Sequence, residues 1–239
     1  MRTLSIALLA FVSAAADDWI DLVGDAGLER WKKPANGWSV AGEVSLDGAD
    51  GKKLAGKEGR GSILNGKDGR AANLLTADEY GDLEAHVEFM VSKGSNSGVY
   101  FQGRYEIQIL DSAGKKEVGY SDCGGIYQRW DPARGKGQEG YEGRAPRANA
   151  SKAAGEWQSF DVVFRAPRFD AAGKKTANAR FVKVTHNGQV IHEEVEVTGP
   201  TRAGAFEDEK PLGPIMLQGD HGPVAFRNLR VRPFKDGGK

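Results

Sequence analysis

Residues 83–89 of the chain read Leu-Glu-Ala-His-Val-Glu-Phe, and apolar and polar side chains alternate along the whole stretch. Successive side chains of a β-strand point to opposite faces, so this pattern predicts a strand with one buried and one exposed face. The predicted strands cover residues 83–89, 99–102, 105–110, 160–164, 181–185, 189–192, 215–218 and 224–231. No convincing helical periodicity accompanies them, which predicts an all-β protein.

Two local signals indicate how these strands are connected. Asn187-Gly188 lies between apolar segments and predicts a tight hairpin, because both central residues of such a turn adopt positive φ. Near the C-terminus the apolar parity shifts between Phe226 and Leu229, which predicts a β-bulge at Arg227-Asn228. Many short strands joined by glycine-rich turns predict a sandwich or barrel rather than an α/β fold.

Composition limits the class of protein. Of 239 residues, 39% are hydrophobic and 28% are charged, which is the balance of a globular chain with one buried core. The 33 Lys and Arg residues equal the 33 Asp and Glu residues, so no charge excess favours nucleic acid or an anionic membrane surface. The single cysteine, Cys123, excludes an internal disulfide, and we interpret it as a packed small residue.

The start of the chain has the pattern of a signal peptide. Arg2 precedes an apolar segment at residues 4–12, and small residues follow at positions 13–16. The apolar segment is too short to span a bilayer, so we predict no membrane span. We expect a signal peptide at residues 1–16, a single β-sandwich domain at residues 17–239, and an exported protein that is periplasmic or secreted.

Residues 112–156 show no clear strand or helix, and loops of this length are usually functional or disordered. Aromatic residues recur in this segment and at its end: Tyr120, Tyr127, Trp130, Tyr141 and Trp157. Aromatic rings can lie against the apolar C–H faces of sugars, which favours a binding role. Rings that only fix the loop to the core are an equal alternative for each of them.

Polar side chains on the non-core face of two neighbouring strands are the best candidates for a site. Alternation places Glu106 and Gln108 on one face of their strand, and Tyr100 and Gln102 on the corresponding face of the preceding strand. A solvated outer face is the alternative interpretation. Such a face tends to carry Lys, Glu and Thr, whereas Tyr, Gln and Glu together are suited to binding hydroxyl groups, which favours a sugar site.

Seven blocks of sequence are similar, in order, to the motifs of one family. They are Tyr80-Gly81-Asp82, residues 95–101, 104–111, 124–127 and 155–158, Asn187-Gly188, and residues 217–222 followed by Phe226-Arg227-Asn228. Over residues 19–233 the chain resembles the 3-keto-disaccharide hydrolase domain family, formerly known as a domain of unknown function. The resemblance implies a concanavalin A-like jelly-roll sandwich of two antiparallel sheets, the fold of lectins and glucanases. It also implies activity on glycosides whose sugar carries a ketone at C3.

The implied chemistry follows from this ketone. A carbonyl at C3 acidifies the C2 proton, so a base can remove it, the enolate can expel the aglycone from C1, and added water completes a net hydrolysis. We assign Glu106 as base or acid, His221 as its counterpart, and Gln108 with Arg227 as stabilisers of the enolate. The residues expected to bind hydroxyl groups are Asn96, Tyr100, Gln102, Arg104 and Tyr127, with Asp111 near the rim.

The expected partner is a small carbohydrate, with nucleic acid excluded and the oligomeric state not determined. Carboxylates and histidine are also able to hold a divalent cation that polarises the ketone, but no metal-ligand spacing or other cofactor motif is evident. Two segments depart from the family pattern, residues 21–28 and Gln128-Arg129-Trp130, and they bear on substrate preference.

Two other functions remain open. Residues 106–111 resemble the Glu-x-Asp-x-x-Glu active-site strand of laminarinase-type endoglucanases, which need two carboxylates, but Gln108 replaces the central acid. A non-catalytic carbohydrate-binding module is the second alternative, because a sandwich fold does not by itself determine function.

Overall fold

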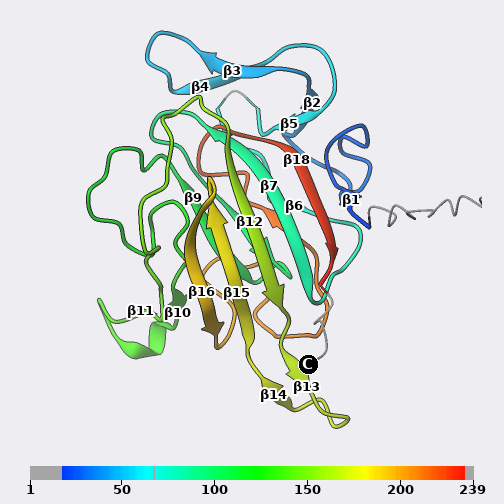
Figure 1. Cartoon of the computed structure of the whole chain (residues 1–239), viewed down its shortest axis with the longest axis vertical. Coiled ribbons are helices and arrows are strands. Elements are labelled where there is room, and N and C mark those ends of the chain that lie inside the picture. The colour runs from blue at the N-terminus through cyan, green and yellow to red at the C-terminus, as the bar shows by residue number, and fades with distance from the viewer. Residues whose placement is uncertain (1–17, 67, 235–239) are drawn as a thin grey trace, which may run out of the picture.

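Strand β7 (Leu83–Val91) contains the alternating segment and lies in the middle of the larger sheet (Figure 1). From Leu83 to Phe89 its alternate side chains are buried, and those between them are half-buried. The structure is a computed structural model that describes residues 18–66 and 68–234. The predicted signal peptide, residues 1–16, lies outside the described residues.

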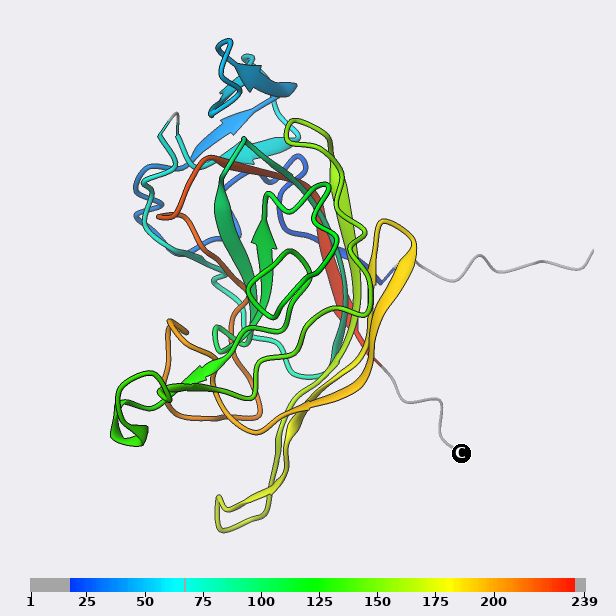
Figure 2. The ribbon, with the colours of Figure 1, turned by 90° about the vertical axis from the view of Figure 1, so that its left-hand side faces the viewer.

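Two antiparallel sheets form the body of the molecule. The larger sheet contains, in spatial order, β16 (Gln189–Val197), β15 (Ala179–His186), β12 (Gln158–Arg165), β7, β18 (Val224–Pro233), β5 (Ser62–Leu64) and β2 (Ser39–Ala41), with β1 (Ile20–Asp21) paired to β18. The smaller sheet contains β6 (Leu74–Leu75), β17 (Met216–Leu217), β8 (Asn96–Phe101) and β9 (Tyr105–Leu110). Figure 2 shows the molecule from the side. The predicted all-β, concanavalin A-like sandwich is confirmed.

Short hairpins extend from this body. They are β3 (Val44–Asp47) with β4 (Lys53–Gly56), β10 (Arg129–Trp130) with β11 (Gly140–Tyr141), and β13 (Arg168–Phe169) with β14 (Lys175–Ala177). A 3-10 helix, η1 (Pro132–Arg134), lies between β10 and β11. β10, β11 and η1 lie in residues 112–156, the segment without sequence periodicity. The sequence did not predict them, because two or three residues are too few to show a period. Within residues 18–66 and 68–234, no helix has the length and apolar character needed to cross a membrane.

The core between the two sheets is aromatic. Phe101 of β8 lies against Phe164 of β12 and Phe181 of β15, with ring centroids 5.3 and 5.4 Å apart. Phe89 of β7 packs on Phe160 at 4.8 Å, and all five rings are buried. The smaller sheet therefore covers the larger one with one face and leaves its other face free for a site.

The predicted hairpin turn and the predicted β-bulge are both confirmed. Asn187 and Gly188 join β15 to β16 with φ of 49° and 82°, as the hairpin requires. The pairing of β18 with β7 shifts register between Arg227 and Arg230, and Asn228 has φ of 43° in this bulge.

Two predicted strands extend beyond the observed ones. Of the strand expected at residues 215–218, only Met216–Leu217 (β17) forms. The strand expected to reach residue 102 ends at Phe101, because Gln102 adopts φ of 53° and begins the turn to β9. The amide of Arg104 closes this turn by donating to the carbonyl of Phe101 at 3.0 Å. The alternation of side chains therefore stops one residue earlier than the sequence pattern indicates.

Removing one ring should show how much the sandwich depends on this core. We expect Phe164→Ala to lower the free energy of unfolding by about 3–5 kcal/mol, because it leaves a cavity among Phe101, Tyr105 and Phe181. Urea denaturation measures the change, with the exposed Lys174→Ala as control, for which about 0.5 kcal/mol or less is expected. Equal midpoints for the two variants would contradict this description of the core.

Candidate active site

The candidate site lies on the face of the smaller sheet that points away from the core. β8 and β9 pair with Tyr100 opposite Glu106 and Gly98 opposite Gln108. Ile107, which lies between Glu106 and Gln108 in β9, belongs to the hydrophobic core. Strand alternation therefore turns Tyr100, Glu106 and Gln108 to the outer face together.

These side chains line a cavity of about 320 Å³. The residues selected from the sequence that lie here are Asn96, Tyr100, Glu106, Gln108, Tyr127 and His221. The sequence-based selection missed three further lining residues, Arg202, Ala203 and Gln218.

Glu106 is a buried acid, with 2% of its surface exposed. Its carboxyl group fills the space beside Gly98, where a Cβ atom would lie 2.2 Å from Oε1 of Glu106. Burial raises the pKa of Glu106 to about 8, against the opposing effect of a hydrogen bond with Tyr100. The side chain is therefore an uncharged acid at neutral pH and becomes a strong carboxylate base above it.

Two tyrosines flank this carboxyl group. Burial, together with the nearby Glu106, raises the pKa of Tyr100 far above its ordinary value and also raises the pKa of Tyr127. The amide of Tyr127 donates to the carbonyl of Glu106 at 3.1 Å, so the segment carrying Tyr127 runs along the edge of β9. Both phenols stay protonated at physiological pH; that of Tyr100 donates to the carbonyl of Arg202 at 3.4 Å, and that of Tyr127 is able to donate to a ligand.

Three side-chain amides supply acceptors. Oδ1 of Asn96, Oε1 of Gln108 and Oε1 of Gln218 are buried and have no hydrogen-bond partner among the described residues. Buried polar atoms are nearly always satisfied in folded proteins, and leaving one unsatisfied costs about 1–3 kcal/mol. A ligand rich in hydroxyl groups would supply the missing donors.

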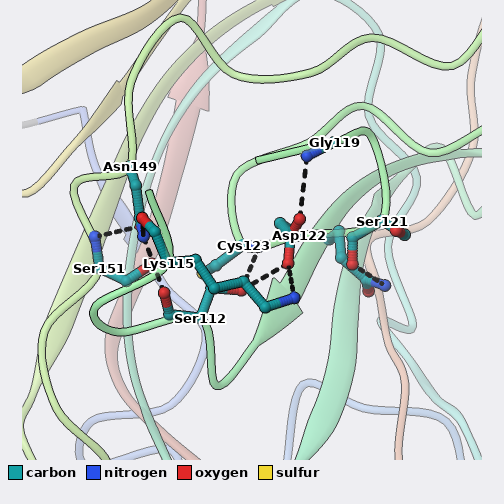
Figure 3. Close-up of polar contacts among 9 residues, drawn as sticks. Ser112, Lys115, Gly119, Ser121, Asp122, Cys123, Asn149 and Ser151 are labelled. Carbon is teal, nitrogen blue, oxygen red and sulfur yellow. Dashed lines mark hydrogen bonds and ion pairs between the residues drawn. The ribbon is translucent and has the colours of Figure 1, made fainter. Parts of the chain in front are cut away.

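The loop after β9, which carries Ser121 and Asp122 (Figure 3), holds Gln108 in place. Nε2 of Gln108 donates to the carbonyl of Ser121 at 3.2 Å. The neighbouring Asp122 accepts from the amide of Gly119 at 2.9 Å and from Lys115 at 2.5 Å. Burial alone would raise the pKa of Asp122, but these bonds outweigh burial and lower it, so a charged carboxylate fixes the loop.

The same loop contains Cys123, the single cysteine of the chain. Cys123 is buried, its amide donates to Oγ of Ser112 at 3.0 Å, and Asn149 donates to the carbonyl of Ser112 at 2.7 Å (Figure 3). Burial raises the pKa of the Cys123 thiol to about 12. The thiol is thus a protonated, packed group, as the sequence interpretation states.

His221 lies at the rim of the cavity beside an acid. Its Nδ1 is 2.5 Å from Oδ1 of Asp220, and each of these side chains is 52% exposed. The carbonyl of His221 accepts from the amide of Asn96 at 3.3 Å, which attaches this loop to the start of β8. A histidine oriented by a carboxylate is well placed to exchange a proton with a leaving group.

Two selected residues at the β8–β9 turn lie outside the cavity. Gln102 donates to the carbonyl groups of Tyr80 and Pro211, because its left-handed backbone turns the side chain away from the site. Arg104 pairs with Asp208 at 2.7 Å and is nearly fully buried. Both side chains hold loops together, and neither lines the cavity.

Asp111 and Arg227, which were also expected in the site, do not line the cavity either. Oδ2 of Asp111 accepts from the amide of Gly94 at 2.9 Å, next to the loop that enters β8. Arg227 belongs to the larger sheet, where it pairs with Glu88 at 2.6 Å and lies over the ring of Trp157 at 4.1 Å. Since Phe226 beside it points into the core, Arg227 points to the outer face of that sheet, away from Glu106.

The sequence contains a local signal for Gln218 but none for Arg202, two of the cavity residues that were not predicted. Gln218 follows β17, and its amide donates to the carbonyl of Gly98 at 2.9 Å, so strand alternation from Met216 was a usable signal. Arg202 lies in a loop without periodicity. It reaches the site because its amide donates to the carbonyl of Gln128 at 2.8 Å, a contact that no local pattern encodes.

A metal centre has no support in the cavity. Within residues 18–66 and 68–234, no group of three or more His, Cys, Asp or Glu side chains is placed to hold a metal ion.

The sandwich and this polar, carboxyl-centred cavity define a carbohydrate-active protein of the jelly-roll class. The chain belongs to the family of 3-keto-alpha-glucoside-1,2-lyase-like domains, whose family model matches residues 18–232. This confirms the family resemblance of the sequence blocks. None of the curated proteins searched matches the chain.

Two solved structures from Parabacteroides distasonis ATCC 8503 share the fold. One is a candidate glycosyl hydrolase with a TM-score of 0.61 and 25% identity, and the match covers 91% of this chain and 84% of that one. The other, described in the same way, has a TM-score of 0.57 and 21% identity, and the match covers 91% of this chain and 100% of that one. The second likeness shows the fold alone.

The space beside Gly98 provides a test of the site geometry. We expect Gly98→Ala to destabilise the protein by about 1–3 kcal/mol, because the new methyl group and the Glu106 carboxyl group cannot share one position. Gly119→Ala is the matched control, since its nearest neighbour would lie 4.0 Å from the new Cβ atom. Urea denaturation of both variants measures the difference, and equal stability would show that the carboxyl group lies elsewhere.

Proposed function

We propose that the protein cleaves glycosides whose sugar is oxidised to a ketone at C3, by elimination across C1 and C2 followed by hydration. The observation that carries this proposal is the buried carboxyl group of Glu106, with a pKa raised to about 8, inside a cavity lined by hydroxyl-binding groups. Membership of the 3-keto-alpha-glucoside-1,2-lyase-like family supports the same reaction. The sequence of residues 1–16 supports a periplasmic or secreted place of action.

Glu106 is the base in this reaction. Its carboxylate takes the C2 proton, the electrons of that bond form the enolate of the C3 ketone, and phenol and amide donors of the cavity stabilise the enolate oxygen. Burial raises the pKa of Glu106, which makes its carboxylate a stronger base than an exposed one toward the C2 proton next to the carbonyl.

His221 is the acid. When the enolate collapses, the C3 carbonyl is restored, a C1–C2 double bond forms and the C1–O bond breaks. His221, held by Asp220 at the rim, gives a proton to the departing aglycone oxygen. Water then adds at C1 and gives one proton to His221, which restores the acid, while protonated Glu106 returns a proton to C2, which completes the net hydrolysis.

The two other functions have less support. A two-carboxylate glycosidase needs a second acid across the scissile bond, but Glu106 is the only carboxylic acid among the described residues that line the cavity. A binding module would have no use for an acid whose burial moves its pKa to about 8. The polar lining alone fits binding as well as catalysis, so experiments on turnover decide between them.

Isotope labelling tests the elimination. We expect 3-keto-trehalose or 3-keto-sucrose, incubated with the protein in deuterated water, to release a keto sugar with deuterium at C2, because the C2 proton is exchanged on the enzyme. Mass spectrometry and NMR measure the label, and the free keto sugar with the Glu106→Gln variant corrects for spontaneous exchange. Release without deuterium would mean direct displacement, and binding without release would mean a binding module.

The rate should also depend on pH in one direction. Below a pH of about 8 Glu106 is protonated and cannot accept the C2 proton, so we expect the rate of C2 proton exchange, the step that needs Glu106 alone, to rise with pH about tenfold per unit and level off above about 8. Glu106→Gln should lower kcat by about 10²–10⁴-fold while substrate is still bound, whereas the exposed Glu58→Gln should not. A pH profile that falls through this range would instead make Glu106 the acid.

A further inference from the structure

A second hollow adjoins the catalytic cavity. It has a volume of about 550 Å³, and the residues that matter here are Arg129, Trp130, Tyr141, Pro200, Arg202 and Phe206. Arg202 and Ala203 line both hollows, so one wall is common to them. The two hollows therefore lie next to each other, on either side of Arg202 and Ala203.

The second hollow is formed by segments that are far apart in sequence. Figure 2 shows the hairpin of β10 and β11 beside the segment that carries Arg202. The amide of Arg202 donates to the carbonyl of Gln128, and its guanidinium group lies 3.8 Å from the centre of the Trp130 ring. This stacking and backbone bond together fix the wall between the two hollows.

The chemistry of the two hollows differs. The catalytic cavity has three side-chain amides, from Asn96, Gln108 and Gln218. No Asn or Gln is among the described residues that line the second hollow, which has aromatic rings and prolines instead. Its polar groups are mainly guanidinium groups and carboxylates. The first hollow is thus suited to a ring with many hydroxyl groups, and the second offers ring faces and guanidinium planes on which a flat ring can stack.

Stacked planes are the main feature of the second hollow. Arg134 and Arg129 lie 4.3 and 5.0 Å from the centre of the Tyr141 ring, in addition to the pair of Arg202 with Trp130. Trp130 nevertheless keeps 40% of its surface exposed. An aromatic ring is the ligand that gains most from an exposed indole beside guanidinium planes, because it can stack on both.

We infer that this hollow is the aglycone site and that it selects 3-keto glucosides with an aromatic aglycone, with Trp130 as the specificity-determining residue. The inference rests on the proposed function, since it places the C1 substituent on the Arg202 side of the catalytic cavity. Trp130 lies in Gln128-Arg129-Trp130, the segment that departs from the family pattern.

Matched substrates test this assignment. We expect Trp130→Ala to lower kcat/KM for phenyl 3-keto-α-glucoside about tenfold more than for the methyl analogue, because only the phenyl group stacks on the indole. Trp130→Phe should retain most of the difference between the two substrates, and the exposed Lys136→Ala is the control. An equal loss for phenyl and methyl substrates, or an equal loss for 3-keto-trehalose and the phenyl substrate, would overturn the assignment.

A binding measurement separates this inference from the proposed function. Calorimetric titration with unoxidised phenyl α-glucoside needs no turnover, and we expect Trp130→Ala to weaken its binding relative to methyl α-glucoside. If no keto glucoside is cleaved but this Trp130-dependent binding is present, the proposed reaction fails and the aromatic site stands. If cleavage proceeds and Trp130→Ala binds the phenyl compound as well as the natural chain does, the aromatic site is overturned.

Discussion

The antiparallel pairing of β8 with β9 is the constraint on which the site depends. This pairing sets Tyr100 directly opposite Glu106, while Ile107 is held in the core against the aromatic side chains of the larger sheet. Because the side-chain period of a strand is two, burying Ile107 obliges Glu106 and Gln108 to face the other way. A shift of one residue in this register would bury the carboxyl group in the core and expose the isoleucine.

The same pairing makes Glu106 chemically unusual. The carboxyl group uses the space left by the missing side chain of Gly98 on the partner strand, and the segment of Tyr127 covers the outer edge of β9. Burial then raises the pKa of Glu106, whereas His221 at the rim remains half-exposed beside Asp220. The site thus has one buried carboxyl group and one half-exposed imidazole, and the proposed elimination uses the first as the base and the second as the acid.

Sequence reasoning succeeded where residues follow strand parity and failed where the backbone leaves it. Glu106, Gln108 and Tyr100 were placed on one face by alternation alone, and they lie there. Gln102 was placed with them, but its positive φ ends the strand and directs its amide to Tyr80 and Pro211. Arg227 was selected from a motif, and a motif does not state which of two sheets, or which face, carries it.

The sequence by itself determined the all-β sandwich, the family, and the strand face that carries the candidate base, because these follow from local periodicity and from ordered motifs. Only the tertiary structure decided which loops close over that face. Arg202 and Trp130 come together through a backbone hydrogen bond and a stacked guanidinium group between distant segments. The high pKa of Glu106 likewise arises from the burial that all these segments produce together, and burial is a property of the packed chain that no local pattern contains.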